Sequence, residues 1–124
     1  MECPKCTSLM EDVEVDEVII KRCTYCKGLW FDRFKHKYLK GLDGSEEIDI
    51  GDPDVGKDFN KIEDIFCPDC SAPMIKMVVA QQSHIWYESC SKCFSVFFDA
   101  GEFKDYVEED IIDFFKDLFT PERK

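Results

Sequence analysis

Residues 3–6 read Cys-Pro-Lys-Cys and residues 23–26 read Cys-Thr-Tyr-Cys, and these two motifs decide the fold of the chain. The pattern returns at 67–70 and 90–93, so four Cys-x-x-Cys motifs, here called knuckles, use all 8 cysteines. One knuckle can bend around a soft cation, and two knuckles complete a tetrahedral shell of four sulfurs. The predicted ligands are Cys3, Cys6, Cys23 and Cys26 in site 1, and Cys67, Cys70, Cys90 and Cys93 in site 2.

Reduced cysteines in this pattern indicate bound metal, and we predict two Zn²⁺ ions, one in each site. An iron centre of the rubredoxin kind uses similar spacing and is the less favoured alternative. Disulfides would suit a secreted protein, but Cys3 lies two residues after Met1, so we do not expect a signal peptide. No stretch has the apolar length of a membrane span, so we expect a cytoplasmic protein without membrane contact.

The 16 residues between the first two knuckles predict a β-hairpin, because two short apolar runs flank Asp16 and Glu17. Residues 29–31 suit a third strand. Asp32 is expected to cap a helix over residues 33–40.

The second pair of knuckles encloses 19 residues, which predicts a longer hairpin and loop. Residues 77–79 and 84–87 supply its apolar runs, and residues 94–98 replace the third strand. Asp99 then occupies the place of Asp32, so the chain contains an internal repeat.

The segment between the two units, residues 42–64, carries nine acidic and two basic residues together with several glycines. We predict an acidic linker that is for the most part a solvated spacer. The whole chain has a net charge of -11. This charge repels phosphate backbones and weighs against nucleic acid binding by the protein as a whole.

The last part of the chain predicts one long helix over residues 100–119. Asp99 and Glu102 have the spacing of a capping box, and apolar residues from Phe103 to Leu118 recur at intervals of three and four. Because this apolar face is wider than the small ribbon before it can cover, we expect the helix either to bridge both ribbons or to meet a protein partner or a second copy of the chain.

The predicted fold class is a small metal-stabilised α+β protein: two tandem zinc ribbons, each a β-hairpin plus a third strand, and each followed by a helix. The expected divisions are ribbon 1 with a short helix (1–41), the acidic linker (42–64), ribbon 2 (65–99) and the long amphipathic helix (100–119). Each half is small enough to need a metal ion for stability.

The repeated unit resembles the bacterial zinc-ribbon family named after general transcription factor IIB. The first copy matches in both knuckles and in Gly-Leu-Trp-Phe-Asp at 28–32, and the second in both knuckles and in Phe-Phe-Asp-Ala-Gly-Glu-Phe at 97–103. The resemblance implies a zinc-ribbon fold and bound zinc, and we do not carry over promoter binding from it.

The chain departs from the family pattern at a few positions. Thr7 and Ser71 follow the first knuckle of each copy, where the family usually has glycine, and Phe34-Lys35 stands where Gly-Glu is expected. Phe94-Ser95 replaces the Lys27-Gly28 of the first copy. These changes affect loops and capping but leave the ligands intact.

Other candidate site residues have simpler roles. His36 and His84 are expected to be surface or strand residues, because four thiolates already close each site. Aromatic residues after each ribbon are expected to pack in the core rather than to stack on bases: Trp30, Phe31, Phe97 and Phe98. No nucleophile–base arrangement or phosphate loop is evident, so we do not expect an enzyme.

The favoured function is a non-enzymatic adaptor that contacts a protein partner, for example in transcription. One alternative is nucleic acid binding by ribbon 1, where basic residues cluster: Lys21, Arg22, Lys27, Arg33, Lys35, Lys37 and Lys40. Another is a redox or zinc-release switch based on the thiols.

Overall fold

The computed structural model describes residues 1–79 and 82–108 of the chain. Both hairpins and both third strands form as predicted. In the first unit β1 (Met10–Val15) pairs antiparallel with β2 (Val18–Cys23), which pairs with β3 (Leu29–Phe31). Asp16 and Glu17 both have positive φ, 50° and 69°, as the tight turn of a two-residue hairpin requires.

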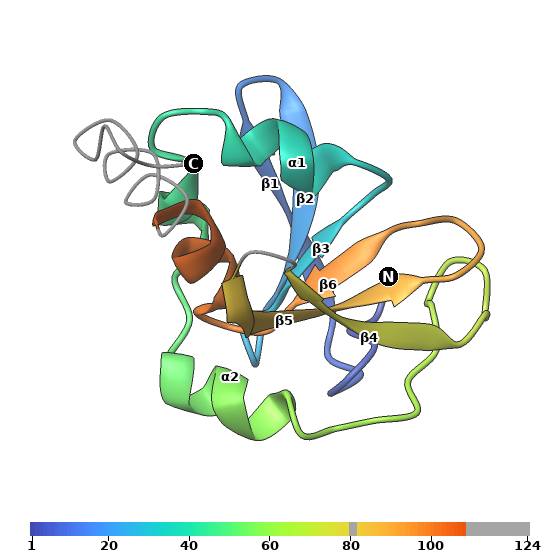
Figure 1. The fold of residues 1–124 in the computed structure, drawn as a ribbon. Helices are drawn as coiled ribbons and strands as arrows, with labels where there is room; N and C mark the ends of the chain where they lie inside the picture. The colour runs from blue at the N-terminus through green and yellow to red at the C-terminus, as the bar shows by residue number, and fades with distance from the viewer. Residues whose placement is uncertain (80–81, 109–124) are drawn as a thin grey trace, which may run out of the picture.

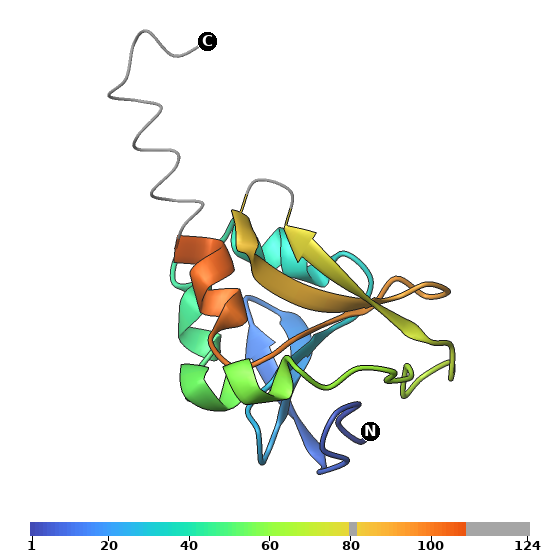
Figure 2. The same cartoon turned by 60° about the horizontal axis from the view of Figure 1, so that its bottom comes forward.

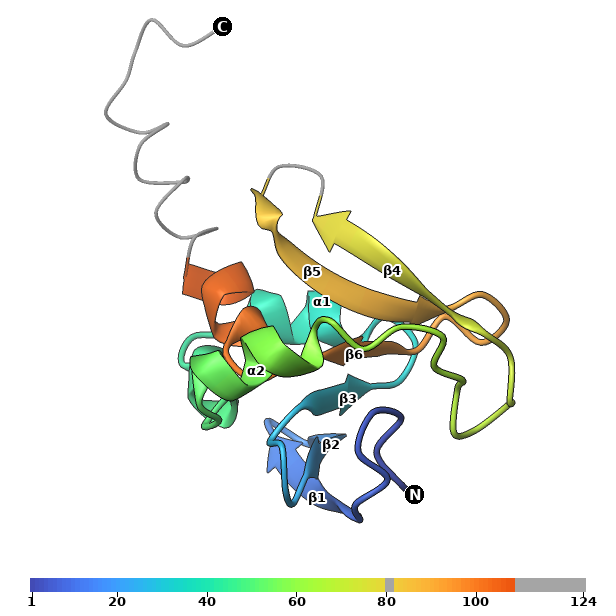
Figure 3. The ribbon, with the colours of Figure 1, turned by 90° about the horizontal axis from the view of Figure 1, so that it is seen from below.

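The second unit repeats this arrangement with β4 (Met74–Val79), β5 (Gln82–Cys90) and β6 (Val96–Phe98). Strands β3 and β6 pair antiparallel with each other, Trp30 opposite Phe97. The two ribbons therefore form one six-stranded sheet in the order β1-β2-β3-β6-β5-β4, which can be followed in Figures 1 and 3.

Apolar residues cover both faces of this sheet, because side chains alternate along β3 and β6. On one face Leu29, Phe31 and Phe98 pack with Leu39 and with Val107 near the end of the described chain. On the other face Trp30 and Phe97 pack among the cysteines. Helices α1 and α2, described below, lie on opposite sides of the sheet (Figure 1).

The segment predicted as a solvated linker is folded, so the spacer interpretation is wrong. It contains the 3-10 helix η1 (Ser45–Ile48) and α2 (Pro53–Phe59), and Ile48 is buried in the core. Two of its glycines, Gly51 and Gly56, lie in close contact with Ala100. A Cβ added to Gly56 would lie 1.9 Å from the carbonyl oxygen of Ala100, so only glycine allows this approach.

Helix α1 (Lys35–Lys40) begins two residues later than predicted, and Asp32 does not cap it. The residue before its first turn is Phe34, in the left-handed conformation at φ 66°, without a side-chain cap. The Asp32 carboxylate instead contacts Nζ of Lys35 at 3.2 Å and accepts a hydrogen bond from the Trp30 indole at 3.2 Å.

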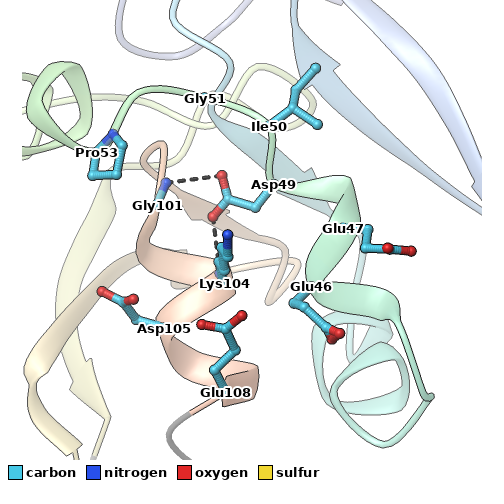
Figure 4. Close-up of a pocket in the computed structure, with 10 residues that line it drawn as sticks. All are labelled: Glu46, Glu47, Asp49, Ile50, Gly51, Pro53, Gly101, Lys104, Asp105 and Glu108. Atoms are coloured by element: carbon cyan, nitrogen blue, oxygen red, sulfur yellow. Dashed lines mark hydrogen bonds between the residues drawn. The ribbon is translucent and has the colours of Figure 1, made fainter.

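The predicted capping box of the last helix is also wrong. Residues 102–108 are helical and lie beside η1 and α2 (Figures 1 and 2). Asp49, at the end of η1, accepts hydrogen bonds from the amides of Gly101 and Lys104, each at 2.9 Å (Figure 4). The buried Asp99 side chain does not cap the helix, and the Glu102 carboxylate accepts a hydrogen bond from the backbone amide of Trp86. A carboxylate some fifty residues away thus caps this helix.

The remainder of the predicted helix 100–119, from residue 109 onward, lies outside the described residues. Phe103 and Val107 of its apolar stripe are buried in the core, as is Tyr106. Within residues 1–79 and 82–108, no helix has the length and apolar character that crossing a bilayer requires.

Candidate metal centres

The eight cysteines gather into the two predicted quartets. In site 1 the Sγ atoms of Cys3 and Cys26 lie 3.8 Å apart. Those of Cys6 and Cys23 lie 3.3 Å apart, and all four fall within 4.8 Å of one another. Zinc–sulfur bonds of about 2.3 Å in a tetrahedron place neighbouring sulfurs about 3.8 Å apart. The quartet therefore has the dimensions of a zinc site.

Site 2 has the same form in the second ribbon. Sγ of Cys67 lies 3.7 Å from that of Cys93. Sγ of Cys70 lies 3.2 Å from that of Cys90, and again all four sulfurs fall within 4.8 Å. These separations exceed a disulfide bond of about 2.05 Å, and all eight cysteines are free thiols.

The backbone after each knuckle adopts the left-handed conformation, which turns the chain back under the sulfurs. Four residues share it, at φ 63° or 64°: Thr7, Lys27, Ser71 and Phe94. Glycine adopts this conformation without steric cost, which explains why the related family favours it at the positions of Thr7 and Ser71. The departures from the family pattern keep the backbone conformation and replace only the residue that adopts it.

Backbone amides point at the sulfurs in the second knuckle of each site. The amides of Tyr25 and Cys26 donate to Sγ of Cys23 at 3.4 Å. The amides of Lys92 and Cys93 do the same for Cys90. Such donors stabilise thiolate, the form that binds metal.

The thiols of each quartet compete for ionisation. In site 1 the hydrogen bond with Cys26 lowers the pKa of Cys3 to about 5, and the same bond raises the pKa of Cys26. In site 2 burial opposes ionisation of Cys90, yet the amides of Cys93 and Lys92 and the neighbouring thiols lower its pKa to about 6. Burial raises the pKa of Cys67 to about 12. A dication removes this competition because it stabilises four thiolates together.

A buried ion cluster beside the metal centres was not predicted from the sequence. Lys5, inside the first knuckle, places Nζ 2.7 Å from Oδ2 of Asp99 and 2.8 Å from Oε2 of Glu88. It also donates to the carbonyl oxygen of Phe59 at 3.0 Å. Nζ of Lys76 approaches the Glu88 carboxylate at 3.8 Å. Lys5 therefore joins ribbon 1 to ribbon 2 and to the segment that connects them.

The carboxylates of this cluster are incompletely satisfied. Oε1 of Glu88 and Oδ1 of Asp99 have no hydrogen-bond partner, and the contact of Lys5 with Glu88 is an ion pair without hydrogen-bond geometry. Burial raises the pKa of Asp99 to about 6, against the opposing effect of the Lys5 charge. Stability should therefore depend strongly on Lys5.

The two histidines take different places, and among the described residues the quartets consist of cysteines. His84 lies in strand β5, consistent with the expectation of a strand residue. His36 does not lie on the surface: it is buried on α1 against the rings of Phe31, Phe98 and Tyr106. Burial lowers its pKa to about 4, so this imidazole is neutral. The expectation of a surface residue is wrong for His36, because α1 turns this side chain toward the sheet.

The aromatic residues after each ribbon are buried, as predicted: Trp30, Phe31, Phe97 and Phe98. The basic residues of ribbon 1 are partly neutralised. Lys21 pairs with Asp12, and Arg22 pairs with Glu11 at 3.0 Å. Within residues 1–79 and 82–108, Arg33 has no carboxylate partner.

Comparison with known proteins bears on ribbon 1. The model of the transcription factor zinc-finger family matches residues 2–39. Searches of curated proteins and of solved structures gave no match. Residues 2–39 are therefore a zinc-ribbon domain of the transcription factor IIB type, and the second quartet, at 67–93, is consistent with a tandem copy.

Proposed function

We propose that this zinc-ribbon protein is a non-enzymatic interaction module in a reducing compartment such as the cytoplasm. Two zinc ions hold the double ribbon, and an exposed aromatic and basic surface beside α1 binds a protein partner. The main observation in support of this proposal is a pair of exposed phenylalanines, Phe34 and Phe94, which both adopt the left-handed conformation, at φ 66° and 64°.

The two copies of the repeat differ at these positions. Phe34 occupies the place of Gly101 in the second copy, which has φ 88°, and Phe94 occupies the place of Lys27. A bulky residue in the left-handed region costs about 1–2 kcal/mol relative to its preferred conformations. The chain thus holds a phenylalanine in a conformation for which its second copy uses glycine.

Folding gains little from either ring. Phe34 is 53% exposed, Phe94 is 46% exposed, and neither belongs to a buried cluster of the described structure. The Arg33 guanidinium lies between them, 5.1 Å from the centre of the Phe34 ring and 5.2 Å from that of Phe94. Strained, exposed aromatic residues that the fold does not need are typical of binding surfaces.

A groove continues this surface toward the first hairpin. Ile19 and Tyr38 line it together with Phe34, and its volume is about 500 Å³. Both Ile19 and Tyr38 are about half exposed. We refer to Ile19, Arg33, Phe34, Tyr38 and Phe94 as the α1 surface. Aromatic residues and arginine are enriched where protein interfaces are strongest.

The proposed role of the metal is structural. With a zinc ion bound, the four thiolates would complete each tetrahedral shell and leave no position for a metal-bound water or substrate. Each zinc would then stabilise its ribbon, and the shared sheet would hold both ribbons in a fixed relation to the α1 surface. This arrangement supports binding rather than catalysis.

Site-directed photocrosslinking tests the proposal. The replacement of Phe34 by p-benzoylphenylalanine keeps a large aromatic ring at the surface. The same replacement at Tyr25, an exposed aromatic residue in a knuckle, is the matched control. In cells that produce the full chain, we expect protein adducts from position 34, identified by mass spectrometry, and few from position 25. Equal labelling at both positions, or adducts with nucleic acid alone, would contradict a protein-binding surface beside α1.

A further inference from the structure

We propose that the partner of the α1 surface is the acidic, apolar segment 109–119 of a second copy of this chain. This inference rests on the proposed function and names its partner. The segment reads Glu-Asp-Ile-Ile-Asp-Phe-Phe-Lys-Asp-Leu-Phe and lies outside the described residues. The α1 surface supplies apolar and basic contacts that match both properties of this sequence.

The segment combines charge with large apolar side chains. It carries four acidic residues and one lysine, for a net charge of -3, together with three phenylalanines, two isoleucines and one leucine. Burial of the apolar side chains of such a segment is favourable only where its carboxylates are paired with cations or stay in water. A groove that is apolar at its floor and basic at its rim meets this condition.

The groove of the α1 surface has mostly this distribution: its charged lining consists of Arg33 and Lys35, with Glu17 as an acidic residue at the hairpin turn. Ile19, Phe34 and Tyr38 form its apolar part. At its rim, Nζ of Lys37 lies 5.8 Å from the centre of the Phe34 ring, and Arg33 lies on the other side of that ring. Neither cation has a carboxylate partner within residues 1–79 and 82–108, so both can meet acidic groups from outside the fold. A net charge of -11 makes nucleic acid a poor alternative occupant.

The geometry favours a second copy over the chain's own segment. Residues 102–108 pack against the far side of α1: the Lys40 ammonium lies 3.9 Å from the centre of the Tyr106 ring, and His36 also contacts Tyr106. At 100° per residue, His36 and Lys40 project about opposite to Phe34 and Tyr38. To reach the groove of its own copy, the segment would have to pass around α1 from the side that Tyr106 contacts. A second copy faces no such constraint.

Reciprocal exchange would close a twofold dimer, in which each copy offers one groove and one segment. The association should then depend on protein concentration and weaken as salt increases, because part of it is electrostatic. The excess apolar face predicted for the end of the chain would be covered in the same contact.

Charge reversal in the full-length, zinc-loaded protein tests the pairing. Arg33→Glu with Lys37→Glu should weaken the dimer about tenfold or more in light scattering or native mass spectrometry. Asp113→Lys with Asp117→Lys should do the same, and all four changes together should restore association. The matched control is Lys57→Glu with Lys61→Glu, which makes the same charge change on exposed residues of the opposite side and should leave association unchanged. A monomeric wild-type chain at all concentrations, or equal weakening by the control pair, would overturn the proposal.

A mixed-isotope crosslink separates the possible occupants. The wild-type chain labelled with ¹⁵N is mixed with unlabelled chain that carries p-benzoylphenylalanine at position 38. We expect crosslinks from position 38 to ¹⁵N-labelled peptides of segment 109–119. Crosslinks within one chain only would overturn the choice of a second copy. Adducts in cells with a different protein and none with this segment would refute the inference but leave the proposed function intact, whereas adducts with nucleic acid alone would refute both.

Discussion

The replacement of Lys5 by methionine offers a sensitive test of how the two ribbons are joined. Methionine retains the length of the side chain but removes the ammonium that contacts Asp99 at 2.7 Å and Glu88 at 2.8 Å. Both carboxylates are buried, with Glu88 only 2% exposed. The loss of one partner of a buried ion pair leaves an uncompensated charge and costs about 3–5 kcal/mol. We therefore expect Lys5→Met to lower the free energy of unfolding by about that amount.

The loss should depend on pH with a definite sign. Burial already raises the pKa of Asp99 to about 6, and the Lys5 charge opposes this rise. Removal of that charge must raise the pKa further, so the carboxyl takes up a proton more readily and the unpaired charge disappears as the pH falls. The destabilisation should accordingly be larger at pH 8 than at pH 6.

Urea unfolding of the zinc-loaded protein at a fixed free zinc concentration measures both effects. Lys92→Met is the matched control, because Lys92 also precedes the second cysteine of a knuckle but is exposed. It should change stability by less than about 0.5 kcal/mol. Zinc content should be equal in both variants. A loss below about 1 kcal/mol for Lys5→Met, or the same loss for both variants, would refute the role of Lys5 as a buried link.

Three further changes test individual features of the fold. Gly56→Ala should lower the free energy of unfolding by more than about 2 kcal/mol in urea, since the new Cβ would lie 1.9 Å from the oxygen of Ala100. Gly41→Ala, whose new Cβ would have its nearest atom at 3.6 Å, should be neutral or slightly stabilising. Similar effects of the two variants would contradict the close packing of α2. The pKa of His36 in the folded protein, about 4, lies below its usual 6.5, so stability is lost as the pH falls from 6.5 toward 4. Between pH 7 and 5, the free energy of unfolding of His36→Phe should fall by about 2 kcal/mol less than that of the wild type. Identical pH profiles would show that His36 is not buried as a neutral group. Phe34→Gly should maintain or raise the melting temperature, since it relieves the positive φ of 66°. It should also abolish the crosslinks formed by p-benzoylphenylalanine at position 38. A large drop in melting temperature would mean that the ring stabilises the fold.

The local features of this chain were accessible from its sequence. The ligand quartets follow from cysteine spacing, because four knuckles leave no cysteine over. The first hairpin follows from Asp16 and Glu17 between two apolar runs, where the turn and both strands lie within a few residues. In each case the residues that decide the structure are neighbours in the chain.

The features that sequence patterns missed depend on contacts between distant segments. Asp99 has the spacing of a capping residue, but Asp49 takes that role, and Asp99 pairs with Lys5 from the other end of the chain. The glycines of 42–64 suggested flexibility, whereas Gly56 is required for close contact with Ala100. The composition of a segment predicts its local conformation, but it does not show which distant part of the chain the segment packs against.

The pairing of β3 with β6 has a physical reason that is visible only in the structure. Trp30 and Phe97 lie opposite each other on adjacent strands, on the face that carries the metal centres. A single ribbon would leave the outer edge of its third strand unpaired and these aromatic residues half covered. The pairing of the two third strands satisfies both strand edges and covers these aromatic residues. This accounts for one shared sheet in a chain whose sequence repeats.

Native mass spectrometry with circular dichroism during chelator titration tests the central claim, that two closed four-thiolate sites hold structural zinc. The account predicts two zinc ions per chain, no disulfide, and loss of the β-sheet signal as the zinc is removed, since each structural site is worth on the order of 10–16 kcal/mol at neutral pH. A chain that keeps its full β-sheet signal after verified removal of both metal ions would contradict it.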